Sequence, residues 1–225
     1  MDIGQQIVII LSVLLGVWYV VGAIINRRRG VATYQWIKGG LESLGKITEA
    51  KWIGTSGSGG RLIVDAGTKP FRRIEVVFLL DSREILPLWL VNLLRGKKDE
   101  MILKANLRRV PSTPFEIGSQ GNKALKNLGA STGMTIQAFE SVPDFAVVTR
   151  EKGQEEKIIT RIEQFLSQYG ESIKSISLQR QAPHLILRAA LPVLRNDPPE
   201  AFFEDVKKII APETGSDSET PDDNE

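Results

Sequence analysis

The longest hydrophobic run of the chain lies close to its N-terminus. Residues 7–25, IVIILSVLLGVWYVVGAII, include no charged side chain. As a helix with a rise of about 1.5 Å per residue they would extend about 28 Å, close to the roughly 30 Å hydrocarbon core of a bilayer. A cleaved signal peptide has a basic leading region, a shorter apolar run and small residues at its end. This run follows Asp2 and ends in NRRRG, so the pattern predicts a transmembrane anchor over residues 7–26.

The charges that flank this run predict its orientation. Arg27, Arg28 and Arg29 follow it directly, whereas only Asp2 precedes it. Lysine and arginine are retained on the cytoplasmic side of a membrane. We therefore expect a plasma-membrane or inner-membrane protein with an exterior N-terminus over residues 1–6 and a cytoplasmic remainder. A buried helix of a soluble core is the alternative, which the length of the run disfavours.

Beyond the anchor, apolar residues alternate between helical and strand-like spacing. Helical spacing predicts a basic juxtamembrane helix over residues 27–46. Strict alternation over residues 71–80 predicts a strand in which four side chains share one face: Ile74, Val76, Phe78 and Leu80. Similar patterns predict strands over 46–53, 61–64, 100–109, 134–139, 145–149, 173–180 and 184–191, and helices over 86–95, 120–128, 154–169 and 198–211.

These elements together predict an α+β fold. One N-terminal transmembrane helix is followed by a cytoplasmic domain over residues 47–211, with a mixed or antiparallel sheet and packed helices. Two sub-domains meeting near residues 110–114 remain an alternative division. Residues 212–225 contain no aromatic or aliphatic side chain and cannot offset the entropy of ordering, so a disordered acidic tail is expected there.

Composition narrows the chemistry that the protein can perform. The chain has no cysteine, which excludes disulfides, thiolate zinc sites and a cysteine nucleophile. Residues 27–109 carry 17 lysines and arginines against 8 acidic residues, a net charge of +9. Two explanations of this excess are the positive charges that set membrane topology and an attraction to anionic lipids. A third is a solvent-exposed surface without a further role. Nucleic acid is not expected as a partner, because no recognition helix or aromatic-basic motif accompanies the charges.

The predicted helix that begins at Leu86 is apolar on nearly all sides, with Pro87 at its start and Gly96 at its end. One interpretation is a helix packed over the sheet of the neighbouring strands, and it is the one the pattern favours. The alternative is contact with the inner leaflet. In that case Trp89 and the leucines enter the lipid, and three cations meet lipid phosphates: Arg95, Lys97 and Lys98. Arg27, Arg28 and Arg29 would lie at the same surface.

A glycine-rich stretch, GTSGSGGR, precedes the predicted strand at residues 61–64. A phosphate-binding loop of the Walker type needs a Lys-Ser or Lys-Thr pair and a following helix, and this stretch has neither. The pattern therefore favours a hairpin between two antiparallel strands. Its tip is a hypothetical partner-binding loop formed by Gly54, Ser56, Gly57, Ser58, Gly59 and Gly60.

No catalytic, metal-binding or cofactor-binding set is recognised along the chain. His184 is the only histidine, and no segment near it supplies an orienting carboxylate and a nucleophile. The carboxylates show no metal-ligand spacing. We therefore expect no cofactor and favour a non-enzymatic scaffold, adaptor or accessory subunit that binds the lipid bilayer and a protein partner. The alternatives are a membrane tether for nucleic acid and a membrane-anchored enzyme of unfamiliar type, which would use His184, Asp65, Asp81 or Asp144.

Overall fold

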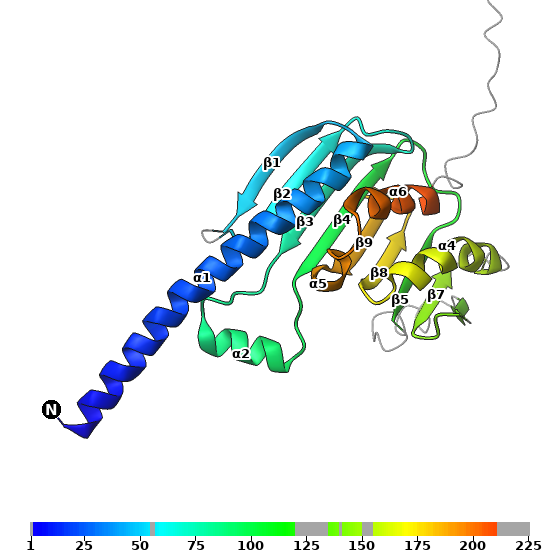
Figure 1. Cartoon of the computed structure of the whole chain (residues 1–225). Helices are drawn as coiled ribbons and strands as arrows, with labels where there is room; N and C mark the ends of the chain where they lie inside the picture. The colour runs from blue at the N-terminus through cyan, green and yellow to red at the C-terminus, as the bar shows by residue number, and fades with distance from the viewer. Residues whose placement is uncertain (1, 55–56, 120–134, 140, 150–154, 211–225) are drawn as a thin grey trace, which may run out of the picture.

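The fold combines one antiparallel sheet with helices that cover one of its faces (Figure 1). The computed structural model describes residues 2–54, 57–119, 135–139, 141–149 and 155–210. Nine strands are hydrogen-bonded in the order β1-β2-β3-β4-β9-β8-β5-β7-β6. They are β1 (Ile47–Ile53), β2 (Gly59–Asp65), β3 (Phe71–Leu79), β4 (Glu100–Leu107), β5 (Phe115–Ser119), β6 (Thr135–Ala138), β7 (Phe145–Thr149), β8 (Ile173–Leu178) and β9 (Leu185–Ala190). The prediction of mixed helix and antiparallel sheet is confirmed.

The helices are α1 (Ile3–Leu44), α2 (Leu86–Leu94), α4 (Glu155–Tyr169), α5 (Leu191–Leu194) and α6 (Pro199–Ile210). The first of them is the longest and has 42 residues. The predicted anchor and the predicted juxtamembrane helix are therefore two parts of one continuous helix. The helix predicted over residues 120–128 and the acidic tail over residues 212–225 lie outside the described residues.

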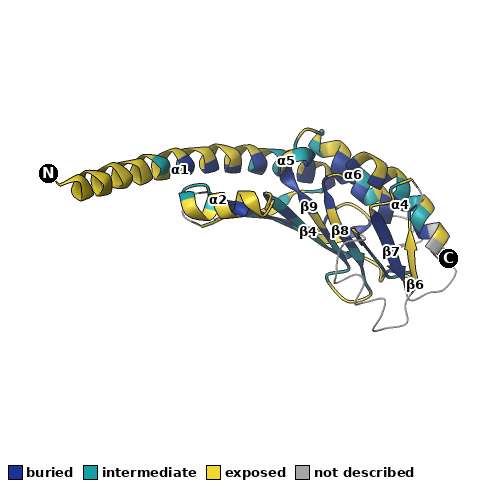
Figure 2. Cartoon of the chain, turned by 90° about the horizontal axis from the view of Figure 1, so that it is seen from below, coloured by how far each residue is buried: buried dark blue, intermediate teal, exposed yellow. Residues whose placement is uncertain are grey.

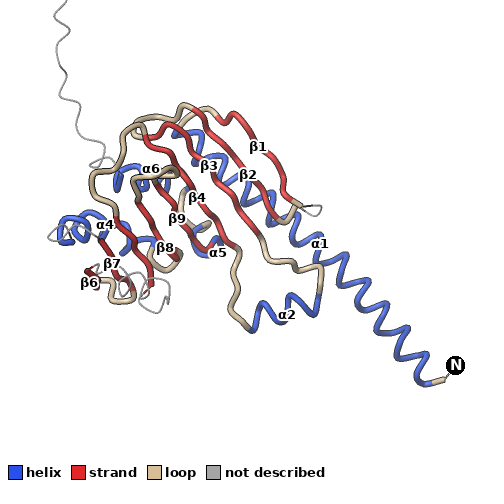
Figure 3. The backbone as a smooth tube through the Cα atoms, turned by 180° about the vertical axis from the view of Figure 1, so that it is seen from behind, coloured by secondary structure: helices blue, strands red, loops and turns tan. Residues whose placement is uncertain are grey.

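The apolar core lies between the sheet and the helices α1, α4 and α6. On β3 the predicted alternation is confirmed, because Ile74, Val76 and Phe78 are fully buried and Leu80 follows them into the core. No helix of the described residues covers the opposite face of the sheet (Figure 3). Strands β4 and β9 pair directly, so both halves of the chain contribute to one sheet and one core cluster.

The second half of α1 is part of this core. Its side chains Ile37, Leu41 and Leu44 are 0% exposed. The backbone of α6 approaches α1 at Gly40, where a Cβ atom would overlap the ring of Phe203. A glycine at this position therefore permits the close packing of the two helices. No separate linker joins the first half of α1 to the domain, because α1 continues without a break into the core.

Candidate functional site

The first half of α1 extends away from the domain and exposes its apolar side chains (Figure 2). Among the described residues, α1 is the one helix long and apolar enough to cross a membrane, by length and composition. One narrow stripe departs from this exposure: Gly22, Asn26 and Gly30 are buried at intervals of four residues. Residues four apart lie on the same face of a helix. The first half of α1 therefore contacts the rest of the protein along this stripe.

Two glycines of this stripe are sites of close backbone contact. A Cβ atom at Gly22 would overlap the Arg83 carbonyl group and would lie 2.7 Å from the Glu84 Cα atom. A Cβ atom at Gly30 would overlap the Gly57 carbonyl oxygen. The spacing of Gly22, Asn26 and Gly30 was a signal for tight packing that the sequence reading missed.

Polar side chains join α1 to the segments before and after α2. This polar cluster consists of Asn26, Asp81, Arg83, Glu84, Asn92 and Asp99. None of the six was predicted as part of such a contact. Two signals were present in the sequence: Asn26 ends the long apolar run, and Asn92 is the one polar residue among the nine of α2. An amide inside an apolar segment needs hydrogen-bond partners, which predicts a polar contact across that segment.

The guanidinium group of Arg83 lies at the centre of the polar cluster. It donates hydrogen bonds to the Asn26 side-chain oxygen at 3.1 Å and to both carboxylate oxygens of Asp99 at 3.0 and 3.1 Å. Asp99 also accepts a hydrogen bond from the backbone N–H of Asp81 at 2.8 Å. The Asn26 amide donates to Glu84 at 2.5 Å. The buried Asp99 carboxylate is therefore both paired and hydrogen-bonded, as a buried charge requires.

Helix α2 lies beside the first half of α1 and outside the core (Figure 1). The Trp89 ring lies 5.2 Å from the Trp18 ring, between centroids, and the Trp18 indole N–H donates to the Arg83 carbonyl at 2.9 Å. Pro87 lies in the first turn of the helix, and Gly96, with φ 65°, lies just beyond its end, as predicted. No residue of α2, all of which the structure describes, belongs to the apolar core cluster.

The favoured prediction that this helix packs over the sheet is therefore wrong. Its exposed apolar side chains are Leu88, Leu90, Val91, Leu93 and Leu94, and its one buried residue is Asn92. The physical reason is the polar cluster: the Asn92 amide donates to Asp81 at 2.6 Å, which turns the polar side of α2 inward. The apolar side chains consequently face outward.

The structure brings some of the predicted lipid-contacting cations together. Arg29 lies 3.6 Å from the Asp99 carboxylate and Lys97 lies 3.8 Å from that of Asp81, so both border the polar cluster. The other four cations of that prediction, all exposed, are Arg27, Arg28, Arg95 and Lys98. On the sheet, three further cations are paired with carboxylates: Arg61 with Glu75, Arg73 with Asp65, and Lys51 with Glu49.

The glycine-rich stretch forms the predicted hairpin between the antiparallel strands β1 and β2. Gly59 and Gly60 are buried, and a Cβ atom at Gly60 would lie 2.5 Å from the Phe78 ring. Gly57 contacts Gly30 of α1, as described above, and Ser56 lies outside the described residues. These glycines are used for internal packing, and a partner-binding role for the loop stays a prediction.

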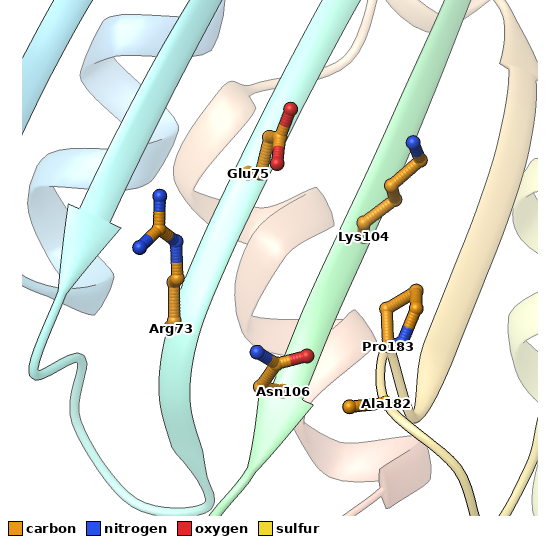
Figure 4. Close-up of a pocket in the computed structure, with 6 residues that line it drawn as sticks. All are labelled: Arg73, Glu75, Lys104, Asn106, Ala182 and Pro183. Carbon is orange, nitrogen blue, oxygen red and sulfur yellow. The ribbon is translucent and has the colours of Figure 1, made fainter.

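A groove of about 320 Å³ lies on the uncovered face of the sheet. Its lining side chains are Arg73 and Glu75 from β3, Lys104 and Asn106 from β4, and Ala182 and Pro183 before β9 (Figure 4). The two strands pair Arg73 with Asn106 and Glu75 with Lys104. The groove is thus polar and of mixed charge. Among these described lining residues there is no histidine, hydroxyl or thiol.

His184 has a structural role in this fold. Its Nδ1 atom accepts a hydrogen bond from the Leu107 backbone N–H at 3.0 Å, which ties β9 to the end of β4. Burial lowers the pKa of His184, so the neutral imidazole that this hydrogen bond needs is favoured. No carboxylate of the described residues is hydrogen-bonded to it.

The three carboxylates considered with His184 are not brought together. Asp65 ends β2 and pairs with the start of β3, whereas Asp81 follows the end of β3. At about 3.3 Å per residue, the length of β3 separates them by more than 20 Å. Asp144 is exposed in the turn before β7. Within the described part of the chain, no group of three potential metal ligands is found.

No protein-family model matches this chain, and no curated protein matches it.

Proposed function

We propose that the protein is a single-pass membrane protein whose α+β domain is a non-enzymatic scaffold or accessory subunit at the cytoplasmic face. The observation that carries this proposal is the continuity of α1. One helix combines an apolar first half, whose side chains are exposed, with a second half that is buried in the core of the domain. An exposed apolar helix of this length is expected to lie in lipid.

The continuity of α1 also suggests what the anchor is for. A flexible linker would tether the domain and leave it free to rotate. Here α1 packs on α6 and on the sheet, so movement of the helix and movement of the domain are coupled. A domain fixed in this way presents the same surface at the same height above the membrane. That property suits a protein that positions a partner rather than one that captures substrate from solution.

The uncovered face of the sheet is the surface that we assign to the partner. It carries the polar groove lined by Arg73, Glu75 and Lys104. No described helix covers it (Figure 3). Three of its lysines are accessible to crosslinking reagents: Lys51, Lys104 and Lys174. On the helical side of the domain, Lys207 and Lys208 provide a matched control.

The membrane orientation is tested with single-cysteine variants, because the chain has no native cysteine to give background. Gln5→Cys reports the short N-terminal segment and Glu171→Cys, at an exposed position, reports the domain. A membrane-impermeant maleimide should label Gln5→Cys in intact cells and Glu171→Cys only after lysis. The reverse labelling would overturn the orientation, and release of the protein by alkaline carbonate would overturn the anchor.

The scaffold role is tested by purifying the full chain from its native membranes in mild detergent after lysine crosslinking. Mass spectrometry should identify one stoichiometric partner, with crosslinks at Lys51, Lys104 or Lys174 and few at Lys207 or Lys208. A protein that is recovered alone would overturn the scaffold role. Crosslinks confined to the helical side would overturn the assignment of the open sheet face.

A further inference from the structure

We propose that α2 lies inside the cytoplasmic leaflet beside α1, with its outward apolar side chains in contact with lipid acyl chains. This inference rests on the proposed membrane anchor. It adds a second membrane-embedded element to a protein whose sequence shows a single span. The occupant of the exposed α2 surface is thus lipid, and not a second copy of the chain or another protein.

The first argument is the depth at which α2 meets α1. Trp18 lies seven residues before Ile25, the end of the uncharged run, which corresponds to about 10 Å along a helix. One leaflet of the hydrocarbon core is about 15 Å thick. If the run crosses the bilayer, Trp18 lies well inside the cytoplasmic leaflet. The Trp89 ring, 5.2 Å away between centroids, must lie in the same layer.

The second argument is the character of the α2 surface. Leu94 is 87% exposed and Leu93 is 56% exposed, so these side chains contact nothing else in the chain over most of their surface. The one polar side chain of the helix, Asn92, is turned inward to Asp81. A helix satisfies its own backbone hydrogen bonds, which is the condition for placing backbone in hydrocarbon. The outward surface of α2 is therefore matched to lipid and continuous with that of α1.

The third argument is the path of the chain into and out of α2. Before the helix, Arg83 and Glu84 contact α1 at Gly22 and Asn26. After the helix, Asp99 binds Arg83 and Arg29. Both ends thus return to the same level of α1, so α2 enters the leaflet and leaves on the same side without crossing.

The charges at the exit of α2 fit this position. Three exposed cations follow the last leucine: Arg95, Lys97 and Lys98. Arg27 and Arg28 lie at the corresponding position of α1. Cations directly beyond an embedded apolar helix are expected to lie among lipid phosphates, where each contributes about 1 kcal/mol near an anionic surface. Two embedded helices joined by the polar cluster fix the tilt of the domain relative to the membrane plane as well as its height.

The test uses the full chain in vesicles of phosphatidylcholine and phosphatidylglycerol. Single cysteines at Leu94, Leu14 and Lys51 are labelled with an environment-sensitive fluorophore, and quenching by spin-labelled lipids is measured. Leu14 reports the anchor, and Lys51 reports the domain surface. We expect strong quenching at Leu14, at least half as much at Leu94, and none at Lys51. Leu94 makes few internal contacts, so its replacement should leave the thermal unfolding of the protein unchanged.

The outcomes separate this inference from the membrane anchor. Quenching at Leu14 without quenching at Leu94 would overturn the placement of α2 and leave the anchor intact. Blue-shifted emission at Leu94 without lipid quenching would mean that a protein surface covers α2, which also overturns the inference. Absence of quenching at both positions would overturn the anchor itself.

Discussion

Two short helices, α2 and α6, pack against the same long helix in opposite ways. Helix α6 contacts the second half of α1 with its apolar face and buries Phe202, Phe203, Val206, Ile209 and Ile210. Helix α2 contacts the first half through the polar cluster and one pair of tryptophan rings, and buries only Asn92. The apolar side chains face inward in α6 and outward in α2.

The difference supports the proposal that α1 passes from lipid into an aqueous environment. An apolar face is buried against protein where water surrounds the molecule, because removal of apolar surface from water is favourable. Where lipid surrounds the molecule this driving force is absent, and close packing and hydrogen bonds hold helices together instead. Along α1, the apolar contact with α6 at Gly40 thus gives way to the polar contact at Asn26.

The largest expected effect comes from the α6 side of this comparison. Phe203→Ala removes a fully buried ring that packs on Gly40 and near Trp36, so it should reduce the free energy of unfolding by about 4 kcal/mol. Leu94→Ala, at the exposed end of α2, should change it by less than about 0.5 kcal/mol. Denaturant unfolding of both variants in the same detergent checks the contrast. Equal losses would mean that α2 is packed against protein.

The next effect comes from the polar cluster. Asp99→Asn keeps the shape of the side chain but leaves the Arg83 guanidinium, 14% exposed, without its carboxylate. Removal of one member of a buried ion pair is strongly destabilising, and here we expect about 3 kcal/mol. Lys174→Gln, which breaks an exposed pair with Glu100, is the matched control and should cost less than about 1 kcal/mol. Similar losses in both variants would show that Asp99 makes no special contribution.

Two glycines of α1 give a sharper local test. Gly22→Ala introduces a methyl group against the Arg83 backbone and should destabilise the α1–α2 contact by about 2 kcal/mol through overpacking. Gly16→Ala, with nothing within 4 Å, should be neutral or slightly stabilising because alanine is the better helix former. Tryptophan fluorescence, to which Trp18 and Trp89 contribute together with Trp36 and Trp52, reports the contact. An unchanged spectrum in Gly22→Ala would contradict the close approach.

The smallest effect is a dependence of stability on pH through His184. Because burial lowers its pKa in the folded protein, the unfolded chain takes up a proton first as the pH falls. The stabilisation is complete above the ordinary histidine pKa of about 6.5 and is lost as the pH falls through that value towards the folded pKa. Unfolding measured between about pH 8 and pH 5 should therefore show a steeper loss in the wild type than in His184→Asn. Parallel curves would show that His184 does not contribute.

Much of the fold was predictable from local pattern. The alternation along β3 assigned Ile74, Val76 and Phe78 to the core, and Pro87 and Gly96 marked the limits of α2. These features depend on residues that are near in sequence, and they can therefore be predicted without a structure. The continuity of α1 was not predicted, because the change from apolar to basic residues at positions 26 and 27 suggested two adjoining elements. Gly40 weakens a helix locally, and the packing of α6 explains its presence.

The placement of α2 depended on contacts between distant residues. Its apolar composition alone is compatible with a buried core helix, which the pattern favoured, and with a helix in lipid. The tertiary structure decided between protein core and outer surface through Asn92 and Arg83, whose partners Asp81, Asp99 and Asn26 come from other segments of the chain.

By itself the sequence determined the elements, the length of the apolar run and the distribution of charge, because each of these is a property of neighbouring residues. Only the tertiary structure decided that one helix joins the apolar run to the core, that the glycine hairpin packs on α1, and that α2 faces outward. The physical reason is that burial and hydrogen bonding are set by which surfaces meet in space. These surfaces come from segments far apart in the chain, such as those of Trp36 and Asp197, which are 161 residues apart.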